Sequence, residues 1–229
     1  MGGPYCPTTS IHINNQVVGD ISWLIDHICS LSGIFMLDSI AWHSIEANLV
    51  IYTDACPQGI GFWSPQLDCG CYGGVASVSP TLPIFFHEAS AVICALHWLS
   101  LLRLRNICHL VVYSNNTNTV NIFHSLKARG FYNRLLKIAV NLLMQANYDL
   151  CVLHIAGLDN TDADALLRHQ LPLVTALCPS ISLKDYQPPP VVAEAAQELV
   201  LVVGVPGYLR TPGHLTYCGP GAHTTLIPP

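Results

Sequence analysis

The chain has 229 residues and a net charge of −5; 51% of its residues are hydrophobic and only 10% are charged. This length allows one sizeable domain with appendages, or two small ones, and is enough to bury a real core. The acidic total excludes a general polyanion binder, because Lys and Arg make the contacts to phosphate.

The apolar composition indicates either a surface that a neighbour covers or a fragment of a larger polyprotein. No uninterrupted apolar run reaches the eighteen or so residues that a membrane span needs, so we expect no membrane partner. The N-terminal residues show no secretory signal, which predicts an intracellular location, cytoplasmic or nuclear. The ten cysteines are scattered singly apart from Cys69 and Cys71, which favours reduced thiols over disulfides or a structural metal site.

Residues 1–45 are predicted to form a segment with one or two helices ahead of the main domain. Residues 1–18 are rich in Gly, Pro, Asn and Thr and indicate a loop or a cut end. Apolar residues at helical spacing then begin at Asp20 and predict a short helix that closes near Gly33.

Residues 46–172 are predicted to form the main domain, because runs with strand and helix periodicity alternate there. The expected elements are strands at 48–53, 59–64 and near 71–76, a helix at 86–103, a strand at 109–113, helices at 116–128 (with a C-cap at Gly130) and 132–146, a strand at 150–155 and a helix at 162–171. Three strands in a meander, followed by strands joined through helices, predict an α/β fold: a mixed five-stranded sheet flanked by helices.

Residues 173–229 are predicted to form a Pro-rich C-terminal tail or linker, because prolines recur from Gln187 to the end. An apolar run from Val192 to Val205 interrupts this segment and is compatible with a helix or a strand.

Three carboxylates lie where the predicted elements would converge. Asp54 ends the first strand, Glu88 lies in the first turn of the long helix, and Asp164 lies on the last predicted helix. Carboxylates from separate elements are the hard oxygen ligands that Mg²⁺ prefers. Taken singly, each residue also has a plain structural role, as a turn cap, a first-turn acid or a surface helix residue.

Four motifs in this order resemble the ribonuclease H domain of reverse transcriptases, in particular those of long-terminal-repeat and tyrosine-recombinase (DIRS-like) retroelements. The resemblance covers residues 49–168. Its motifs are IYTDA (51–55) with GIGFW (59–63), HEA (87–89), VYSNN (112–116) and HIAGLDNTDADALLR (154–168). The last motif is the most specific, because the family typically closes with a Gly, an Asn and an Ala-Asp-x-Leu-x-Arg run.

The resemblance implies a ribonuclease H-like fold and hydrolysis of the RNA strand in an RNA–DNA hybrid by two Mg²⁺ or Mn²⁺ ions. It implies that Asp54, Glu88 and Asp164 are metal ligands in the catalytic site. The family's fourth carboxylate falls on Asn115, which brings an amide oxygen but no negative charge. We therefore expect nuclease activity to be strongly reduced or absent.

The expected partners are an RNA–DNA hybrid or another nucleic acid and, in addition, a polymerase domain. The segment from Ser22 to His43 resembles the connection between polymerase and ribonuclease H domains, while no Tyr-x-Asp-Asp motif predicts polymerisation by this chain itself. Six of the nine basic residues fall between Arg103 and Lys137, which is compatible with a nucleic-acid-binding face or with a solvated helix surface.

The sequence leaves three hypotheses open. The first is a surviving ribonuclease specific for hybrids. The second is a non-catalytic nucleic-acid-binding or structural remnant with the same fold. The third is another member of the ribonuclease H-like superfamily, such as a DNA-cutting recombinase. Polar residues around the fourth strand end are equally ambiguous, because Ser114, Asn116, Thr117 and Asn118 suit either a sugar-phosphate contact or a helix cap.

Overall fold

The computed structural model describes residues 14–30, 42–74, 82–104, 107–128, 132–203, 208–211 and 214–217. The chain forms two compact units, residues 1–37 and residues 38–229. The expected helix end near Gly33 and the expected C-cap at Gly130 lie outside the described residues.

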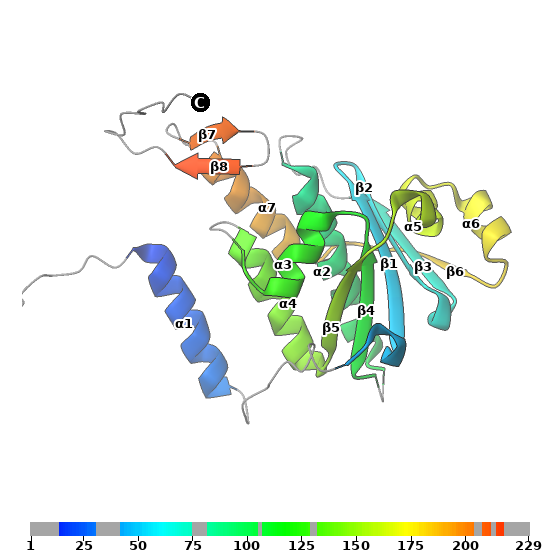
Figure 1. The fold of residues 1–229 in the computed structure, drawn as a ribbon, viewed down its shortest axis with the longest axis horizontal. Helices are drawn as coiled ribbons and strands as arrows, with labels where there is room; N and C mark the ends of the chain where they lie inside the picture. Colours follow the sequence, from blue (N-terminus) through cyan, green and yellow to red (C-terminus); the bar gives the residue numbers. More distant parts are fainter. Residues whose placement is uncertain are drawn as a thin grey trace, which may run out of the picture. The chain divides into compact units, whose positions relative to one another are not determined.

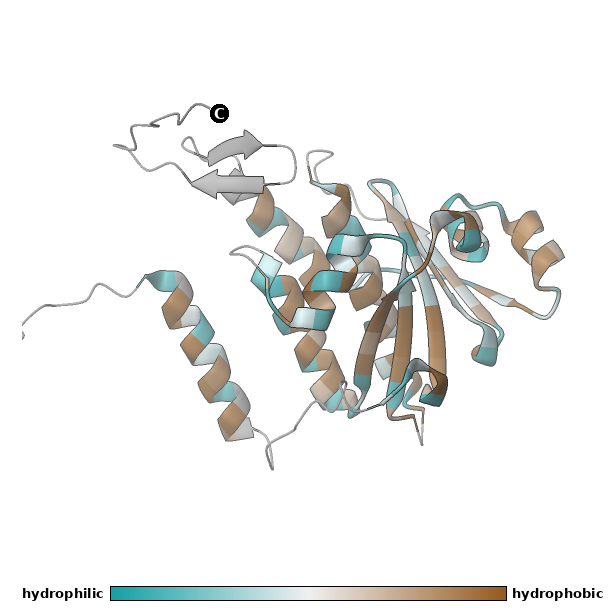
Figure 2. Ribbon diagram, in the orientation of Figure 1, coloured by the Kyte–Doolittle hydropathy of each residue, from teal (hydrophilic) through white to brown (hydrophobic). Residues whose placement is uncertain are grey.

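The first unit contains the helix α1 (Asn15–Ser30). It begins five residues before the predicted start, because Asn14 acts as its cap: the Oδ1 atom of Asn14 accepts a hydrogen bond from the Val17 amide at 2.9 Å. Apolar side chains spaced three and four residues apart, among them Ile21, Leu24 and Ile28, are exposed along one stripe of the helix. Figure 2 shows apolar and polar residues alternating around this helix.

The second unit is built on a six-stranded sheet with the order β5-β4-β1-β2-β3-β6. The strands β1, β2 and β3 form an antiparallel meander, while β4 pairs parallel with β1, β5 pairs parallel with β4, and β6 pairs parallel with β3. The strands are β1 (Leu49–Cys56), β2 (Gly59–Ser64), β3 (Cys69–Gly74), β4 (His109–Ser114), β5 (Asp149–His154) and β6 (Ser182–Asp185). The expected mixed sheet flanked by helices is confirmed, with six strands in place of five.

Helices cover both faces of the sheet (Figure 1). The helix α5 packs on β1, β2 and β3, and α2 packs on β1 and β2. The helix α3 packs on β5 and β4, α4 packs on α2, and α7 packs on α4. The helices are α2 (Ile84–Leu102), α3 (Thr117–Ser125), α4 (Asn133–Ala146), α5 (Thr161–Leu167), α6 (Leu171–Leu177) and α7 (Pro190–Val203). A separate hairpin pairs β7 (Tyr208–Thr211) with β8 (His214–Tyr217).

The central element of the core is α2, whose residues Ala89, Val92 and Ile93 are fully buried. Its length and composition would allow it to cross a membrane, but 72% of its most apolar window is buried inside the domain. It is therefore the core helix of the domain, with apolar residues on all sides because neighbours surround it.

The last helix expected from the sequence, residues 162–171, is two helices in the structure. The chain turns at His169, which adopts a left-handed conformation with φ 55°. Pro172 then lies in the first turn of α6. Proline fixes its own φ, has no amide hydrogen and disfavours helical geometry in the residue before it, so it ends one helix and starts the next.

The segment from residue 173 onward, expected to be a Pro-rich tail, contributes ordered elements to the domain. The strand β6 joins the sheet beside β3, and the apolar run after residue 190 forms the helix α7. The side chains of Val192, Ala196 and Leu199 belong to the main core cluster. The sequence did not predict β6, because it is a four-residue edge strand that is mostly polar and exposed. Within the described residues all eight cysteines are free.

Candidate active site at the ends of β1 and β4

Asp54 lies near the end of β1, in the middle of the sheet. Its neighbour across the antiparallel pair is Gly61 on β2. Its side chain is buried, with 6% of its surface exposed. The Oδ1 atom of Asp54 accepts a hydrogen bond from the Ala55 amide at 2.9 Å. Burial raises the pKa of Asp54 and the nearby charge of Asp164 raises it further, while the hydrogen bonds from Ala55 and Asn115 partly offset these effects.

Glu88 comes to the same place from α2. This helix starts after Pro83, so Glu88 lies in the second turn, and its side chain is only 3% exposed. The Ser114 hydroxyl donates a hydrogen bond to Glu88 Oε2 at 3.4 Å. Burial and the neighbouring Asp54 raise the pKa of Glu88 to about 8, and a hydrogen bond links the two carboxyl groups. Burial beside Asp54 therefore favours the protonated form of Glu88.

Asn115 directly follows β4, which runs parallel to β1. The Nδ2 atom of Asn115 donates a hydrogen bond to Asp54 Oδ1 at 3.3 Å. A carboxylate can only accept, so the amide turns its N–H group, and not its oxygen, toward Asp54. Next to it, Asn116 is the cap of α3: its Oδ1 accepts hydrogen bonds from the amides of Asn118 and Thr119. The capping role left open by the sequence is thus observed for Asn116.

Asp164 is placed by α5, which lies against β1 and β2. The buried Asn160 holds the start of this helix to the sheet, because its Nδ2 donates to the Thr53 carbonyl at 2.9 Å. Gly61 allows the helix to come close: a Cβ atom at this position would lie 2.5 Å from the Ala163 carbonyl oxygen and 2.5 Å from the Leu167 nitrogen. Because Gly61 has no side chain, α5 can pack close to β2. This close packing brings Asp164 near Asp54.

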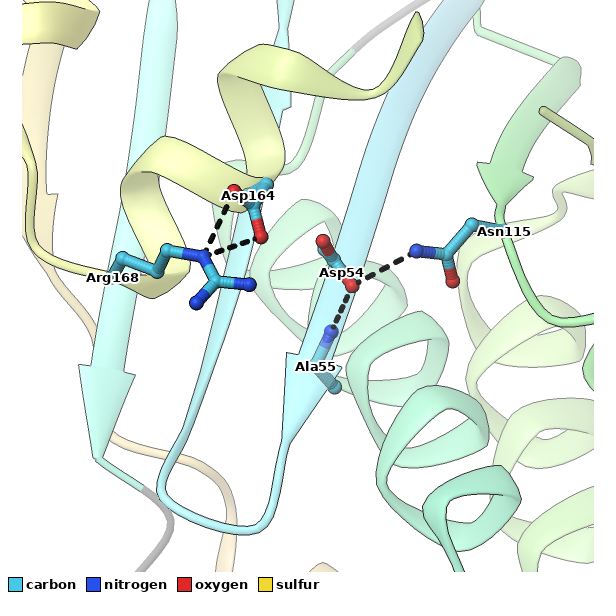
Figure 3. Close-up of polar contacts among 5 residues, drawn as sticks. All are labelled: Asp54, Ala55, Asn115, Asp164 and Arg168. Carbon is cyan, nitrogen blue, oxygen red and sulfur yellow. Dashed lines mark hydrogen bonds and ion pairs between the residues drawn. The ribbon is translucent and has the colours of Figure 1, made fainter. Parts of the chain in front are cut away.

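Arg168 follows Asp164 by one helical turn. Its Nε atom donates to both carboxylate oxygens of Asp164, at 2.8 and 2.9 Å. These hydrogen bonds raise the pKa of Arg168, which stays charged. Figure 3 shows Asp164 on α5, Arg168 at the end of α5, Asp54 on β1 and Asn115 just after β4 gathered around one place.

The structure thus brings together all four positions that the sequence singled out. Asp54 accepts a hydrogen bond from Asn115 and is hydrogen-bonded to Glu88. The negative charge of Asp164 raises the pKa of Asp54. Two other titratable residues of the last motif make different contacts: Asp162 accepts a weak hydrogen bond from the Cys178 thiol at 3.7 Å, and the exposed His154 ends β5 opposite Ser114.

The arrangement does not fit a pair of divalent ions. The donor atoms are of the right chemical kind, because carboxylate oxygens suit Mg²⁺. However, no group of three or more His, Cys, Asp or Glu side chains within the described ranges is placed to hold a metal ion. Two contacts explain this: Arg168 occupies both oxygens of Asp164, and the Asn115 amide presents a hydrogen atom to Asp54.

The predicted basic face is partly engaged within the protein. Arg134 on α4 forms ion pairs with Glu194 and Glu198 on α7. Its guanidinium group therefore ties two helices together, in line with the interpretation as a solvated helix surface. Arg105 and Arg129 lie outside the described residues.

Sequence reasoning missed two residues of the site. Arg168 stood in the most specific motif but received no role, and Asn160 was noted only as part of that motif. The signal for Arg168 was its spacing of four residues from Asp164, which places both side chains on one helix face. No sequence signal reveals the contact between Asn160 and the Thr53 carbonyl, because it joins residues 107 positions apart.

No family model and no curated protein matches the chain. Solved ribonuclease H1 structures are similar to it. LC11-RNase H1 in complex with an RNA/DNA hybrid shows 20% identity and a TM-score of 0.43 over 55% of this chain and 99% of that chain. Ribonuclease H1 from the halophilic archaeon Halobacterium salinarum NRC-1 shows 15% identity and a TM-score of 0.45 over 54% and 97%. LC11-RNase H1 isolated from compost shows 20% identity and a TM-score of 0.40 over 56% and 97%.

The antiparallel meander of β1, β2 and β3, extended by the parallel strands β4 and β5, gives the mixed sheet flanked by helices that the sequence predicted. The fold expected from the sequence motifs is therefore confirmed.

Proposed function

We propose that this chain is a retroelement-derived ribonuclease H-like domain that binds RNA–DNA hybrids and whose hydrolysis of the RNA strand is strongly reduced or absent. One observation carries the proposal: Asp54, Glu88 and Asp164 meet on three separate elements, and the fourth position of this site is the neutral Asn115. In the proposed site, the three acids correspond to metal ligands and Asn115 to the missing one.

The contacts of the site support the loss of activity. A divalent ion needs anionic oxygen ligands that are free to turn toward it. Asn115 contributes no charge, and its amide donates to Asp54. Asp164 already shares both oxygens with Arg168. A metal ion would have to displace the guanidinium group of Arg168. Only three carboxylates, instead of four, would then be present to bind the ion.

The origin in a reverse transcriptase polyprotein is supported by the order of the four motifs and by the exposed apolar side chains of α1. Helices that expose an apolar stripe are commonly covered by a neighbour. A polymerase domain is the partner that we propose for the segment up to residue 45.

A cleavage assay tests the proposed loss of activity. Labelled RNA–DNA hybrid is incubated with Mg²⁺ or Mn²⁺ and with the natural chain, Asn115→Asp, or Asn115→Asp combined with Asp54→Asn. We expect the natural chain to leave the RNA strand intact, Asn115→Asp to cleave it, and the double variant to be inactive again. Cleavage by the natural chain that disappears in Asp54→Asn alone would show instead that the enzyme is active.

A non-catalytic nucleic-acid-binding domain is the second candidate, favoured by the ion pair between Arg168 and Asp164. It predicts that Asn115→Asp also fails to cleave, while the hybrid is still bound with an affinity that falls steeply with salt. The same assay with a DNA duplex distinguishes both candidates from a DNA-cutting recombinase.

A further inference from the structure

The guanidinium group of Arg168 lies at the site but uses only part of its hydrogen-bonding capacity. Arginine has five N–H donors. The Nε atom uses one of them, shared between the two oxygens of Asp164. Within the described parts of the chain, the two terminal nitrogens make no hydrogen bond, and in Figure 3 the dashed lines from Arg168 start at Nε alone. The Arg168 side chain is also accessible, with 62% of its surface exposed.

Asp164 fixes the position of this group. A carboxylate that accepts from one edge of a guanidinium group restricts its rotation, so little entropy is lost when the remaining donors bind a second anion. Arg168 follows Asp164 by one turn at the end of α5, and Asn160 and Gly61 hold the start of that helix close to β1. The cation is therefore presented beside Asp54 by rigid elements and not by a loop.

The site carries less negative charge than four carboxylates would. A site with four carboxylates repels a phosphate group unless metal ions compensate for its charge. Here Asn115 removes one formal negative charge, and Arg168 balances another. An anion that approaches the terminal nitrogens of Arg168 thus meets less repulsion than it would at a site of four acids.

We propose that Arg168, held by Asp164, binds a backbone phosphate of the nucleic acid and provides at this site the positive charge of an absent metal ion. The inference rests on the proposed function, because it assigns a role within the same site. The inference goes beyond the proposed function because it predicts that nucleic acid binds at this site without a divalent metal ion. The ligand group is a phosphodiester, which RNA and DNA strands share.

Metal-free binding tests the proposal. Fluorescence anisotropy is measured in EDTA with a labelled RNA–DNA hybrid and with a DNA duplex of the same sequence, at several salt concentrations. We expect Arg168→Gln to weaken binding about tenfold, the effect of losing a charge-assisted hydrogen bond. The slope of log affinity against log salt should fall by about one. Arg168→Lys keeps the positive charge but loses the planar set of N–H donors. Its affinity should lie between those of the natural chain and Arg168→Gln.

Arg134→Gln is the matched control, because Arg134 is also an arginine bound by carboxylates, but on α4. We expect its affinity to stay within about twofold of the natural chain. An equal loss in both variants would overturn the proposal, since it would reflect total charge. No change in Arg168→Gln, or no detectable binding by the natural chain to either probe, would overturn it as well.

A second comparison separates contact from charge balance. Arg168→Gln also leaves the charge of Asp164 uncompensated, which alone would repel phosphate. In an Asp164→Asn background this repulsion is absent, so a direct contact predicts that Arg168→Gln still weakens binding there. Full recovery of binding in the double variant would contradict the contact. Circular dichroism melting curves confirm that each variant is folded.

The two probes also distinguish this proposal from the proposed function. Binding to the DNA duplex that depends on Arg168, without binding to the hybrid, would reject the hybrid as substrate and retain the phosphate contact. Suppose instead that Asn115→Asp cleaves the hybrid and that Arg168→Gln binds it as tightly as the natural chain does. This outcome would support the proposed function and reject the phosphate contact of Arg168.

Discussion

Glu88 is a buried carboxyl group whose pKa the fold raises. Burial and the neighbouring Asp54 raise its pKa from the ordinary 4.5 to about 8. Between these values the folded chain binds one proton more than the unfolded chain, so stability falls as pH rises. We predict that the free energy of unfolding decreases between about pH 6.5 and 8, by up to about 1.4 kcal/mol per pH unit.

Urea denaturation in EDTA at several pH values in this window measures the effect, and Glu88→Gln is the comparison. Glutamine keeps a donor toward Asp54 but does not titrate, so the slope in the variant should lack the downward contribution of Glu88, while other groups such as Cys69 contribute equally in both proteins. Starting at about pH 6.5 avoids the buried His87, whose lowered pKa makes its own contribution below that pH. Equal slopes in both proteins would contradict the prediction.

Asn115 stabilises the domain in the absence of metal. Its amide donates to the buried Asp54, whereas an aspartate side chain at the same position would place a second carboxylate there. We predict that Asn115→Asp lowers the free energy of unfolding by about 1 to 2 kcal/mol in EDTA and that Mg²⁺ reverses the loss.

The neighbouring Asn116→Asp is a matched control for this variant. Asn116 accepts hydrogen bonds from two amides as the cap of α3, and aspartate performs this role equally well. Thermal melting in EDTA and in Mg²⁺ should therefore show little change for Asn116→Asp. A similar loss in both variants would point to a general effect of added charge.

At the residue level, the sequence predicted which side chains meet but not how they contact one another. The motifs identified Asp54, Glu88 and Asp164, because each stands in a local pattern that the family shares. The direction of the Asn115 amide and the pairing of Arg168 with Asp164 depend on side-chain geometry. No local pattern specifies that geometry.

The packing of α5 on β2 depends on one glycine. A Cβ atom at Gly61 would lie 2.5 Å from backbone atoms of α5, and backbone atoms cannot give way as a flexible side chain can. We predict that Gly61→Ala destabilises the domain by about 2 to 3 kcal/mol and moves Asp164 and Arg168 away from Asp54. Thermal melting measures the loss of stability, and hybrid binding in EDTA measures the loss of the site.

Gly74→Ala is the control on the neighbouring strand, because the nearest atom to its Cβ would be the Gln58 carbonyl oxygen at 3.9 Å. We expect this variant to change stability by less than about 0.5 kcal/mol. If both alanines were equally harmless, the close approach of α5 to the sheet would not exist in solution.

Most elements were predictable because their side chains repeat with a clear period. The expected strand at 59–64 coincides with β2, and the helix at 132–146 differs from α4 by one residue. The strand β6 has no such signal, because its backbone pairs with β3 while its side chains are mostly exposed. The division between α5 and α6 was missed because Leu166, Leu167 and Leu171 continue the helical spacing across the turn at His169.

The whole domain depends on residues that resemble a tail in the sequence. The helix α7 buries Val192, Ala196 and Leu199 in the main core, and Tyr186 is buried beside Phe62. Each large apolar side chain contributes about 1.5 to 3 kcal/mol, and a domain of this size is stable by only about 5 to 15 kcal/mol. We predict that a chain ending at Leu177 does not fold cooperatively.

A chain ending at Val203 is the control, since it keeps β6 and α7 and lacks only the residues after them. Circular dichroism melting should show a cooperative transition for the longer chain, at the temperature of the full chain, and none for the shorter one. Identical transitions in both would show that the core is complete without α7.

The position of β6 also determines how copies of this chain meet one another. The strand β3 contains three glycines, Gly70, Gly73 and Gly74, and without β6 its unpaired backbone groups would form a flat edge. Such an edge attracts strands from other molecules, whereas a short strand bearing Lys184 and Asp185 resists them. Loss of β6 should therefore lead to aggregation, which light scattering would detect. The segment that was predicted to be a linker would then protect the sheet from self-association.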